Sequence, residues 1–400
     1  MDQEQKLRAA SRCVHAGYRA RGDGSAEERA VAPPLSRSST FLLDDDIYGR
    51  ILDGRWSEDY LYTRYRNPTL DVAARRLASL EGAERSLLFA SGLAALHAAV
   101  LGSVPAGGRI VAARQLYGGS WDMLRAGFGE LGFEVLFADV TAPDSFARAL
   151  EEAGAAAADL FVCESASNPI LALADIPALA EAAHGVGARL LVDATFATPL
   201  GQRPLELGAD LVMHSASKYL GGHSDLIGGA VSGSEAMTDG VWTWLRRAGG
   251  CMDPGGAWLL DRGMKTLALR MAAHSERATA LAEFLAGHPQ VAAVHYPGLA
   301  SHPQHGLGER LLDMPGGMLS FEVVGGDGAA LALLRRLTLP LEATSLGGVE
   351  SLVSLPFNTS HARMDDGERL AVGIRPGLVR VSVGIEDTQD LIEDFGRALG

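Results

Sequence analysis

Only three lysines occur in the chain, Lys6, Lys218 and Lys265, although it contains 35 basic residues. Chemistry that needs a side-chain amine must therefore use one of these three, or the N-terminus. Lys6 lies in a polar N-terminal stretch, and Lys265 lies inside a long helical pattern, which is typical of a surface residue. Lys218 instead follows a predicted strand and precedes a glycine-rich stretch. A lysine withdrawn from water can be a neutral amine near neutral pH, so Lys218 is the candidate for nucleophilic or proton-transfer chemistry.

Other polar residues also stand directly after predicted strands. Ser91, Gly92 and Leu93 follow one strand and open a helix, where free backbone N–H groups attract an anion. Asp193 ends a second strand. Because ligands of parallel sheets sit beyond the C-terminal ends of the strands, we expect these groups in one crevice with Lys218. An anion cradle, a carboxylate and a lysine suit the phosphate, the ring nitrogen and the aldehyde of pyridoxal phosphate, so the sequence predicts this cofactor.

The segment from Ser215 to Lys218 also matches the S-x-x-K signature of penicillin-recognising serine hydrolases. That family carries two further motifs, S-x-N and K-T-G. This chain has SDL at 224–226 and KTL at 265–267, and each fails at its last position. The serine-hydrolase interpretation therefore rests on one motif of three.

Helices and short apolar strands alternate from about residue 70. Strands are predicted at 86–89, 109–113, 134–137, 160–163, 189–193 and 210–214. This alternation predicts an α/β fold with a mostly parallel sheet covered on both faces. Later the pattern changes to one long helical stretch and a few strands, which is typical of a smaller α+β domain. We expect an N-terminal arm that makes inter-subunit contacts at 1–60, a cofactor-binding α/β domain at 61–256 and a C-terminal α+β domain at 257–400.

Composition argues against several classes of protein. The net charge of −14 and the lack of a basic stripe disfavour nucleic-acid binding. No apolar stretch is long enough to span a membrane, and the N-terminus is polar. Cys13, Cys163 and Cys251 are few and widely spaced, so we expect a cytoplasmic protein without disulfides or zinc. His302 and His305 flank a proline, which favours a loop over a metal site.

Several longer motifs resemble one enzyme family. They are YTRYRNP at 62–68, YGGS at 117–120, VDATF at 192–196, SASKYLGGHSD at 215–225, SLGG at 345–348 and RVSVGIE at 380–386. Across nearly the whole chain the sequence resembles the pyridoxal-phosphate enzymes of cysteine and methionine metabolism, which include cystathionine γ-synthase, cystathionine γ-lyase and methionine γ-lyase. The resemblance implies a fold-type I transferase like aspartate aminotransferase, with a large α/β domain and a smaller α+β domain.

The resemblance also implies roles for single residues. Lys218 would bond to the cofactor aldehyde and move protons between substrate carbons, and Asp193 would pair with the ring nitrogen. Tyr117 would stack on the ring and act as acid or base at the leaving group. Arg380 would bind the substrate α-carboxylate. Further implied substrate contacts are Ser345, Thr344 and Asn168, and further implied cofactor contacts are Ser91, Gly92, Leu93, Asn168, Thr195, Ser215 and Ser217.

Two residues that directly follow the predicted arm would act in a neighbouring chain. The resemblance implies that Tyr62 and Arg64 reach the phosphate of another subunit. Each active site would then be shared, in a homotetramer built from catalytic dimers, and a monomer would be inactive.

The chain departs from the family pattern at three positions. Ala194 stands where members commonly have Asn, Thr344 where cystathionine-handling members usually have Glu, and Gly119 where methionine γ-lyases typically have Cys. The segment 48–60 is also longer than in compact members. We expect these changes to alter fine tuning and substrate choice and to leave cofactor binding intact.

The expected reaction is elimination of a γ or β sulfur or oxygen group from an amino acid, as by a cystathionine γ-lyase-like carbon–sulfur lyase. The products would be a 2-oxo acid and ammonia. The close alternative is replacement of that group by a thiol, as in cystathionine γ-synthase, and the sequence leaves this choice open. A transaminase and a cofactor-free binding module are the alternatives from other classes.

Overall fold

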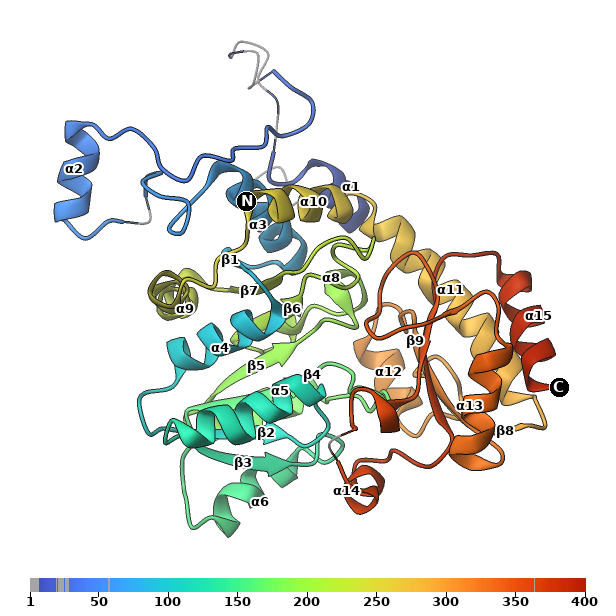
Figure 1. Ribbon diagram of the computed structural model, residues 1–400. Helices are drawn as coiled ribbons and strands as arrows, with labels where there is room; N and C mark the ends of the chain where they lie inside the picture. The colour runs from blue at the N-terminus through green and yellow to red at the C-terminus, as the bar shows by residue number, and fades with distance from the viewer. Residues whose placement is uncertain (1–6, 19, 21–24, 26–28, 57, 363) are drawn as a thin grey trace.

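A seven-stranded sheet forms the frame of the larger part of the computed structural model, which describes residues 7–18, 20, 25, 29–56, 58–362 and 364–400 (Figure 1). Its strands run in the order β1-β7-β6-β5-β4-β2-β3. Only β7 is antiparallel to its neighbours, so the mostly parallel sheet predicted from the sequence is confirmed. The strands are β1 (Arg85–Phe89), β2 (Arg109–Ala113), β3 (Glu134–Ala138), β4 (Leu160–Glu164), β5 (Arg189–Asp193), β6 (Leu211–Ser215) and β7 (Gly229–Gly233).

Strand β7 was not predicted, because its sequence GAVSG is short and rich in glycine. Glycine is required at one end of it. A Cβ atom at Gly229 would lie 2.2 Å from the backbone oxygen of Ser91. The strand can therefore pair with β1 and β6 and still pass directly beside the Ser91 turn.

Helices cover both faces of this sheet. On β1, Leu87 and Phe89 enter one hydrophobic cluster together with α4 (Gly92–Ser103), whereas Leu88 enters another with α3 (Pro68–Glu81). This alternation follows from the two-residue period of a strand. Further helices on the two faces are α6 (Asp144–Glu152), α7 (Ile176–Gly185), α9 (Glu235–Ala248) and α10 (Pro254–Met264). The site at the sheet edge therefore rests on a frame that is packed on both sides.

Two predicted helices differ in the structure. The stretch 121–131 consists of α5 (Gly118–Asp122) followed by the π-helix η2 (Met123–Phe128). The long pattern at 259–285 is divided between α10 and α11 (Leu267–Ala286). At that break the Gly263 carbonyl accepts from the Thr266 hydroxyl (3.2 Å) and from Arg270 Nη2 (2.7 Å). The backbone N–H of Thr266 also donates to this carbonyl (3.2 Å), so the regular helical bonding is interrupted between the two helices.

A five-stranded sheet forms the C-terminal half, in the order β10-β11-β12-β9-β8. The helices α11, α13 and α15 bury a second core against it. The proposed domain boundary at 256 falls within α10 and remains a prediction. The strands are β8 (Val291–His295), β9 (Met318–Val323), β10 (Leu341–Glu342), β11 (Leu352–Ser354) and β12 (Leu378–Ser382), and the helices beside them are α12 (His305–Leu311), α13 (Gly326–Arg336), α14 (Asp366–Ala371) and α15 (Thr388–Leu399).

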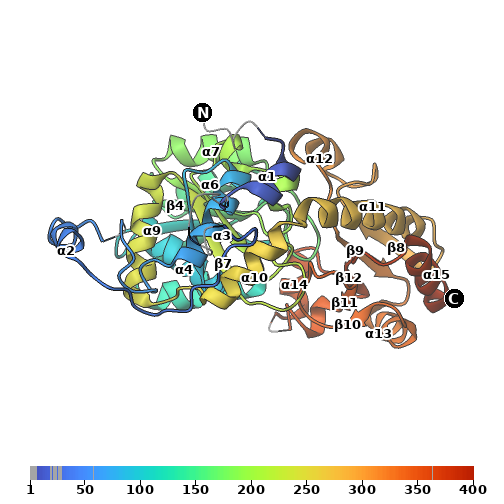
Figure 2. The ribbon, with the colours of Figure 1, turned by 90° about the horizontal axis from the view of Figure 1, so that it is seen from above.

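The N-terminal region contains two short helices that the sequence did not predict. α1 (Ala9–His15) packs against α3 and α11. α2 (Asp45–Leu52) stands away from both sheets and buries none of its residues (Figures 1 and 2). Its N-cap is Asp44, whose side chain accepts from the backbone N–H of Ile47, so the acidic run favours a helix start. Lys6 lies outside the described residues. None of the described helices is long and apolar enough to cross a membrane.

Candidate active site

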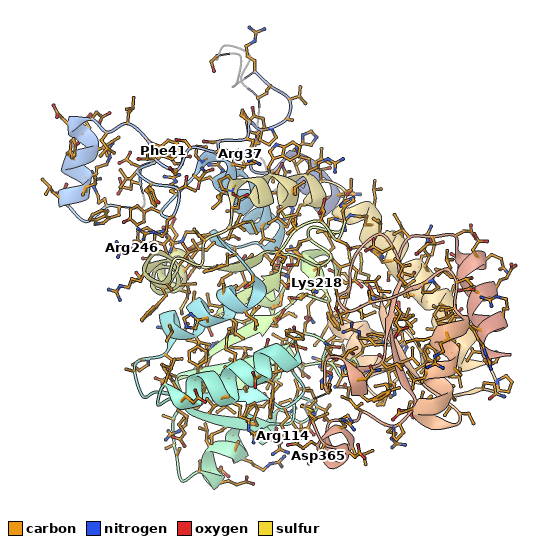
Figure 3. The ribbon with its side chains drawn as sticks, in the orientation of Figure 1. Arg37, Phe41, Arg114, Lys218, Arg246 and Asp365 are labelled. Carbon is orange, nitrogen blue, oxygen red and sulfur yellow. The ribbon has the colours of Figure 1, made fainter. Side chains whose placement is uncertain are left out.

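A cavity of about 650 Å³ opens at the C-terminal edge of the seven-stranded sheet, between the two halves of the chain. Figure 3 shows Lys218 in this position. The structure brings all the predicted site residues to this cavity except Tyr62 and Arg64. Those lining it are Ser91, Gly92, Leu93, Tyr117, Asn168, Asp193, Thr195, Ser215, Ser217, Lys218, Thr344, Ser345 and Arg380.

One part of the cavity presents hydrogen-bond donors suited to an anion. Ser91 caps α4, and its hydroxyl accepts from the backbone N–H of Ala94 (3.1 Å). The N–H groups of Gly92 and Leu93 belong to the first turn of α4, where a helix offers no acceptor. A Cβ atom at Gly92 would lie 3.1 Å from Cβ of Ser215, so glycine allows these two segments to approach closely. Backbone donors and a serine hydroxyl therefore meet at the positive end of a helix dipole.

Asp193 offers a free carboxylate oxygen to the cavity. Its Oδ1 accepts from both the backbone N–H (2.9 Å) and the hydroxyl of Thr195. Its Oδ2 makes no hydrogen bond within the described residues. Burial raises the pKa of Asp193, while the Thr195 hydrogen bonds and the charge of His214 oppose this. His214 is fully buried on β6, where its Nε2 hydrogen-bonds to the carboxyl group of Glu81. The Thr195 contacts thus stabilise the carboxylate form against the effect of burial and leave one oxygen for a partner.

Lys218 is the lysine of this cavity, as predicted. Its Nζ donates to the hydroxyl of Ser345 (2.6 Å). Burial, assisted by the positive charge of Arg380, lowers the pKa of Lys218 to about 8. A substantial fraction of this amine is therefore neutral slightly above neutral pH, as a nucleophile or base requires. Lys265 lies at the end of α10 and forms an ion pair with Asp261 (3.3 Å).

Arg380 on β12 is 7% exposed and has neutral partners. Its Nη1 donates to Asn168 Oδ1 (3.2 Å), and its Nη2 donates to the backbone oxygen of Ser345 (2.9 Å). Ser345 has a φ of +84°, a left-handed conformation that costs free energy for any residue other than glycine. The strained residue contacts both cations of the site, Lys218 through its hydroxyl and Arg380 through its carbonyl.

Tyr117 lies at the mouth of the cavity and is 45% exposed. Its position depends on Gly119, because a Cβ atom there would lie 2.6 Å from the Tyr117 ring. A cysteine at 119, the residue typical of methionine γ-lyases, would therefore require the ring to move. This departure from the family pattern acts on the orientation of the tyrosine.

Glu164 is a site residue to which sequence reasoning gave no role. Its two carboxyl oxygens accept from the backbone N–H groups of Tyr117 (2.5 Å) and Asn168 (3.3 Å). It lies opposite Asp193 in the register of β4 and β5, and burial with the Asp193 charge raises the pKa of Glu164. Its place after a strand was the same signal that identified Asp193. The other lining residues that had not been predicted are Ser120, Ala166, Phe196, Met213, Leu346, Asn358, Thr359 and Ser360.

Tyr62 and Arg64 lie away from the cavity of their own chain. Arg64 Nη1 donates to the backbone oxygen of Arg246 on α9 (2.6 Å), and its guanidinium stacks on Tyr65. Figure 3 shows Arg246 on the side of the molecule that carries the arm, at a distance from Lys218. Within the described residues, no group of three or more His, Cys, Asp and Glu side chains could hold a metal ion.

Comparison with known families decides which cofactor this arrangement serves. A family described as "Cys/Met metabolism PLP-dependent enzyme" matches residues 10–400. The chain belongs to this family. It is therefore a pyridoxal-phosphate-dependent enzyme of the carbon–sulfur lyases and synthases, and the predicted cofactor is confirmed. The free donors at α4, the free oxygen of Asp193 and the amine of Lys218 line one cavity and fit the phosphate, ring nitrogen and aldehyde of that cofactor.

Individual relatives in this family agree over nearly their whole length. The chain is 41% identical to the L-methionine gamma-lyase of Pseudomonas putida, over 98% of this chain and 96% of that protein. It is 40% identical to the cystathionine gamma-lyase of Bacillus subtilis, over 96% and 97%. The crystal structure of cystathionine gamma synthase from Xanthomonas oryzae pv. oryzae in complex with cystathionine has a TM-score of 0.90 at 39% identity, covering 98% of each chain. These neighbours confirm the predicted fold-type I architecture.

Proposed function

We propose that this enzyme eliminates a γ or β sulfur or oxygen substituent from an amino acid and releases a 2-oxo acid and ammonia. The observation that carries the proposal is the pairing of a lysine of lowered pKa with a buried guanidinium in one cavity. The guanidinium suits an amino-acid carboxylate, and the lysine suits the removal of a proton beside it. The relatives named methionine and cystathionine gamma-lyase support this reaction.

The second candidate function is replacement of the same substituent by a thiol. The similarity to a cystathionine gamma synthase favours it. Both reactions use the same first steps and differ in what meets the substrate after the leaving group has departed.

The binding roles follow from the contacts of the cavity. The N–H groups of Gly92 and Leu93, with the hydroxyls of Ser91, Ser215 and Ser217, would hold the phosphate. Asp193 Oδ2 would hold a proton at the ring nitrogen, and Thr195 fixes the other oxygen of that carboxylate. Tyr117 would cover one face of the ring, and Asn168 lies beside it. When bound, the cofactor withdraws electrons from the substrate α-carbon and makes its proton acidic.

The chemical steps would fall to three side chains. Arg380 would bind the substrate carboxylate through two parallel N–H donors, with Ser345 and Thr344 beside the substrate. Lys218 Nζ would bond to the cofactor aldehyde before the substrate arrives, and afterwards take the α-proton and return it to another carbon. The Tyr117 hydroxyl would give a proton to the departing sulfur or oxygen atom.

We further propose a homotetramer of catalytic dimers in the cytoplasm, with sites shared between chains. Tyr62 and Arg64 lie outside their own cavity, as residues that serve a neighbouring subunit would. Cys13, Cys163 and Cys251 are all free, which agrees with a reducing compartment. The division into an arm (1–60), a cofactor domain (61–256) and a C-terminal domain (257–400) is part of this proposal.

A substrate panel tests the reaction. Purified enzyme is given methionine, cystathionine, homocysteine, cysteine or an O-acylhomoserine, with and without added thiol. Elimination yields a 2-oxo acid and ammonia without an acceptor, and replacement yields a coupled thioether. Consumption of an amino acceptor with formation of pyridoxamine phosphate would instead identify a transaminase. Lys218→Ala should abolish both products and the covalent retention of cofactor after borohydride reduction.

A further inference from the structure

A buried pair of a carboxyl group and an imidazole lies behind the cavity, and the proposed mechanism gives it no task. His214 on β6 bonds through Nε2 to Oε1 of Glu81, the last residue of α3 (2.5 Å). Both residues are 0% exposed within this one chain, so a neighbouring subunit cannot contact the pair. Met213 and Ser215 line the cavity, and because side chains alternate along a strand, His214 points from the opposite face of the sheet.

The backbone of β6 connects this pair to Asp193. Asp193 is paired with Met213 in the register of β5 and β6, so His214 follows directly beside it. The backbone N–H of Ser215 donates to the Thr195 hydroxyl oxygen (2.8 Å), and that hydroxyl donates to Oδ1 of Asp193. The strand that carries His214 is therefore tied to the hydroxyl that orients the Asp193 carboxylate.

The buried pair needs a proton to balance its charge. Glu81 Oε2 has no hydrogen-bond partner among the described residues, so His214 is the group that compensates this carboxyl. A fully buried carboxylate beside a neutral imidazole would be very costly, so the proton lies either on Glu81 or on His214, as a positive charge. A negative charge on nearby Asp193 favours the imidazole. The negative end of the α3 dipole acts in the same direction, since Glu81 ends that helix.

We propose that His214, kept positively charged by Glu81, is a positioning residue for the cofactor, because it holds Asp193 in the ionised form that binds the ring nitrogen. Charges of alternating sign then lead from the core to the cofactor, in the order Glu81, His214, Asp193 and protonated ring nitrogen. Burial alone would raise the pKa of Asp193 and weaken this arrangement. The inference rests on the proposed role of Asp193 and adds the group that maintains it.

Cofactor binding to the apoenzyme tests the proposal through the ring nitrogen itself. The two ligands are pyridoxal phosphate and 1-deazapyridoxal phosphate, in which a C–H group replaces the ring nitrogen while the aldehyde and the phosphate are unchanged. The ratio of their dissociation constants measures how much the site gains from that nitrogen. Glu81→Gln keeps an acceptor for His214 and removes the negative charge. We expect the preference for pyridoxal phosphate to fall by about tenfold, through weaker binding of that ligand alone.

A second pair of a histidine and a carboxyl group provides the matched control. His295 on β8 bonds to Glu322 on β9 (3.0 Å), and both lie in the C-terminal sheet, outside the cavity lining. Glu322→Gln removes the charge from the same kind of pair and should leave both dissociation constants unchanged. The double variant Glu81→Gln/His214→Gln replaces the buried pair by two neutral amides, so that no single charge is left buried. It should show the same tenfold loss.

The possible results separate this proposal from the ones beneath it. Equal weakening of both ligands in Glu81→Gln and in the double variant would give the pair a structural role only. An unchanged preference in these variants, while Asp193→Asn lowers it, would show that Asp193 needs no support from His214. An unchanged preference in Asp193→Asn would refute the proposed role of Asp193 and this inference with it. If no amino acid releases a 2-oxo acid or forms a thioether, the proposed reaction fails, and the binding ratio still decides the role of His214.

Discussion

Arg380 is a buried cation without a counter-ion among the described residues, and this has a cost that can be measured. Its partners are the neutral oxygens of Asn168 and Ser345. Burial lowers the pKa of Arg380 to about 10, more than two pH units below that of a free arginine. Since a pKa difference of one pH unit corresponds to about 1.4 kcal/mol, keeping this guanidinium charged costs roughly 3 kcal/mol in the free enzyme.

Replacing Arg380 by methionine should therefore stabilise the protein while it removes substrate binding. The variant keeps a long side chain and loses the charge, so we expect the free energy of unfolding to rise by ~1–3 kcal/mol, as when other buried ions give way to apolar groups. The melting temperature should rise by a few degrees. Two charge-assisted hydrogen bonds to the carboxylate, each worth ~1.5–3 kcal/mol, are lost, so KM should increase by about 100-fold or more.

Thermal unfolding of the substrate-free holoenzyme and steady-state kinetics test both parts. Arg380→Lys is the matched control, because it keeps a charge and loses the two-pronged geometry. It should raise KM without raising the melting temperature. A fall in the melting temperature of Arg380→Met, or a KM within about threefold of the parent enzyme, would refute the interpretation of Arg380 as a destabilised carboxylate anchor.

Three further predictions concern the same site. Apoenzyme should capture pyridoxal phosphate faster as pH rises, with a midpoint near the Lys218 pKa of about 8, because only the neutral amine attacks the aldehyde. Arg380→Met should move that midpoint upward, as followed by absorbance. Glu164→Ala removes the acceptor that holds Tyr117 and should lower kcat by about 10–100-fold with a smaller change in KM, whereas Glu164→Gln retains one acceptor oxygen and more activity, as steady-state kinetics would show. Mixed and reassociated Arg64→Ala and Lys218→Ala subunits should recover roughly a quarter of the parent activity if sites are shared, and no recovery would contradict sharing.

The parts of the site on the parallel sheet were predictable from the sequence. The strands of that sheet other than β7 are short, largely apolar runs, and Asp193 ends one of them while Lys218 follows shortly after another. A parallel sheet directs all those ends to one edge, so order along the chain was enough to place them together. Ser91 and Gly92 carried a second local signal, the start of a helix.

The side of the cavity formed by Asn358 to Ser360 was not predictable in the same way. Asn358 ends a short 3-10 helix after β11 and Ser360 follows it, and nothing in the local pattern relates this segment to the Tyr117 turn. Their contact depends on how the two halves pack, which is a long-range property of the fold. The division of α10 from α11 was missed for a similar reason, because the Arg270 side chain reaches the Gly263 carbonyl, seven residues before it, only after the chain has folded.

The charges of the cavity are kept apart, and this arrangement explains their shifted pKa values. Burial lowers the pKa of Lys218 and Arg380 and raises the pKa of Asp193 and Glu164, yet neither cation forms an ion pair with either carboxyl group among the described contacts. Each is held by a neutral or backbone group. An ion pair within the site would offset the cost of burying these charges and would also occupy the groups proposed to bind a ring nitrogen, an aldehyde and a carboxylate. The free energy lost by separation is therefore recovered when those partners bind and increases their affinity, so the melting temperature should rise with the concentration of cofactor or substrate as mass action requires.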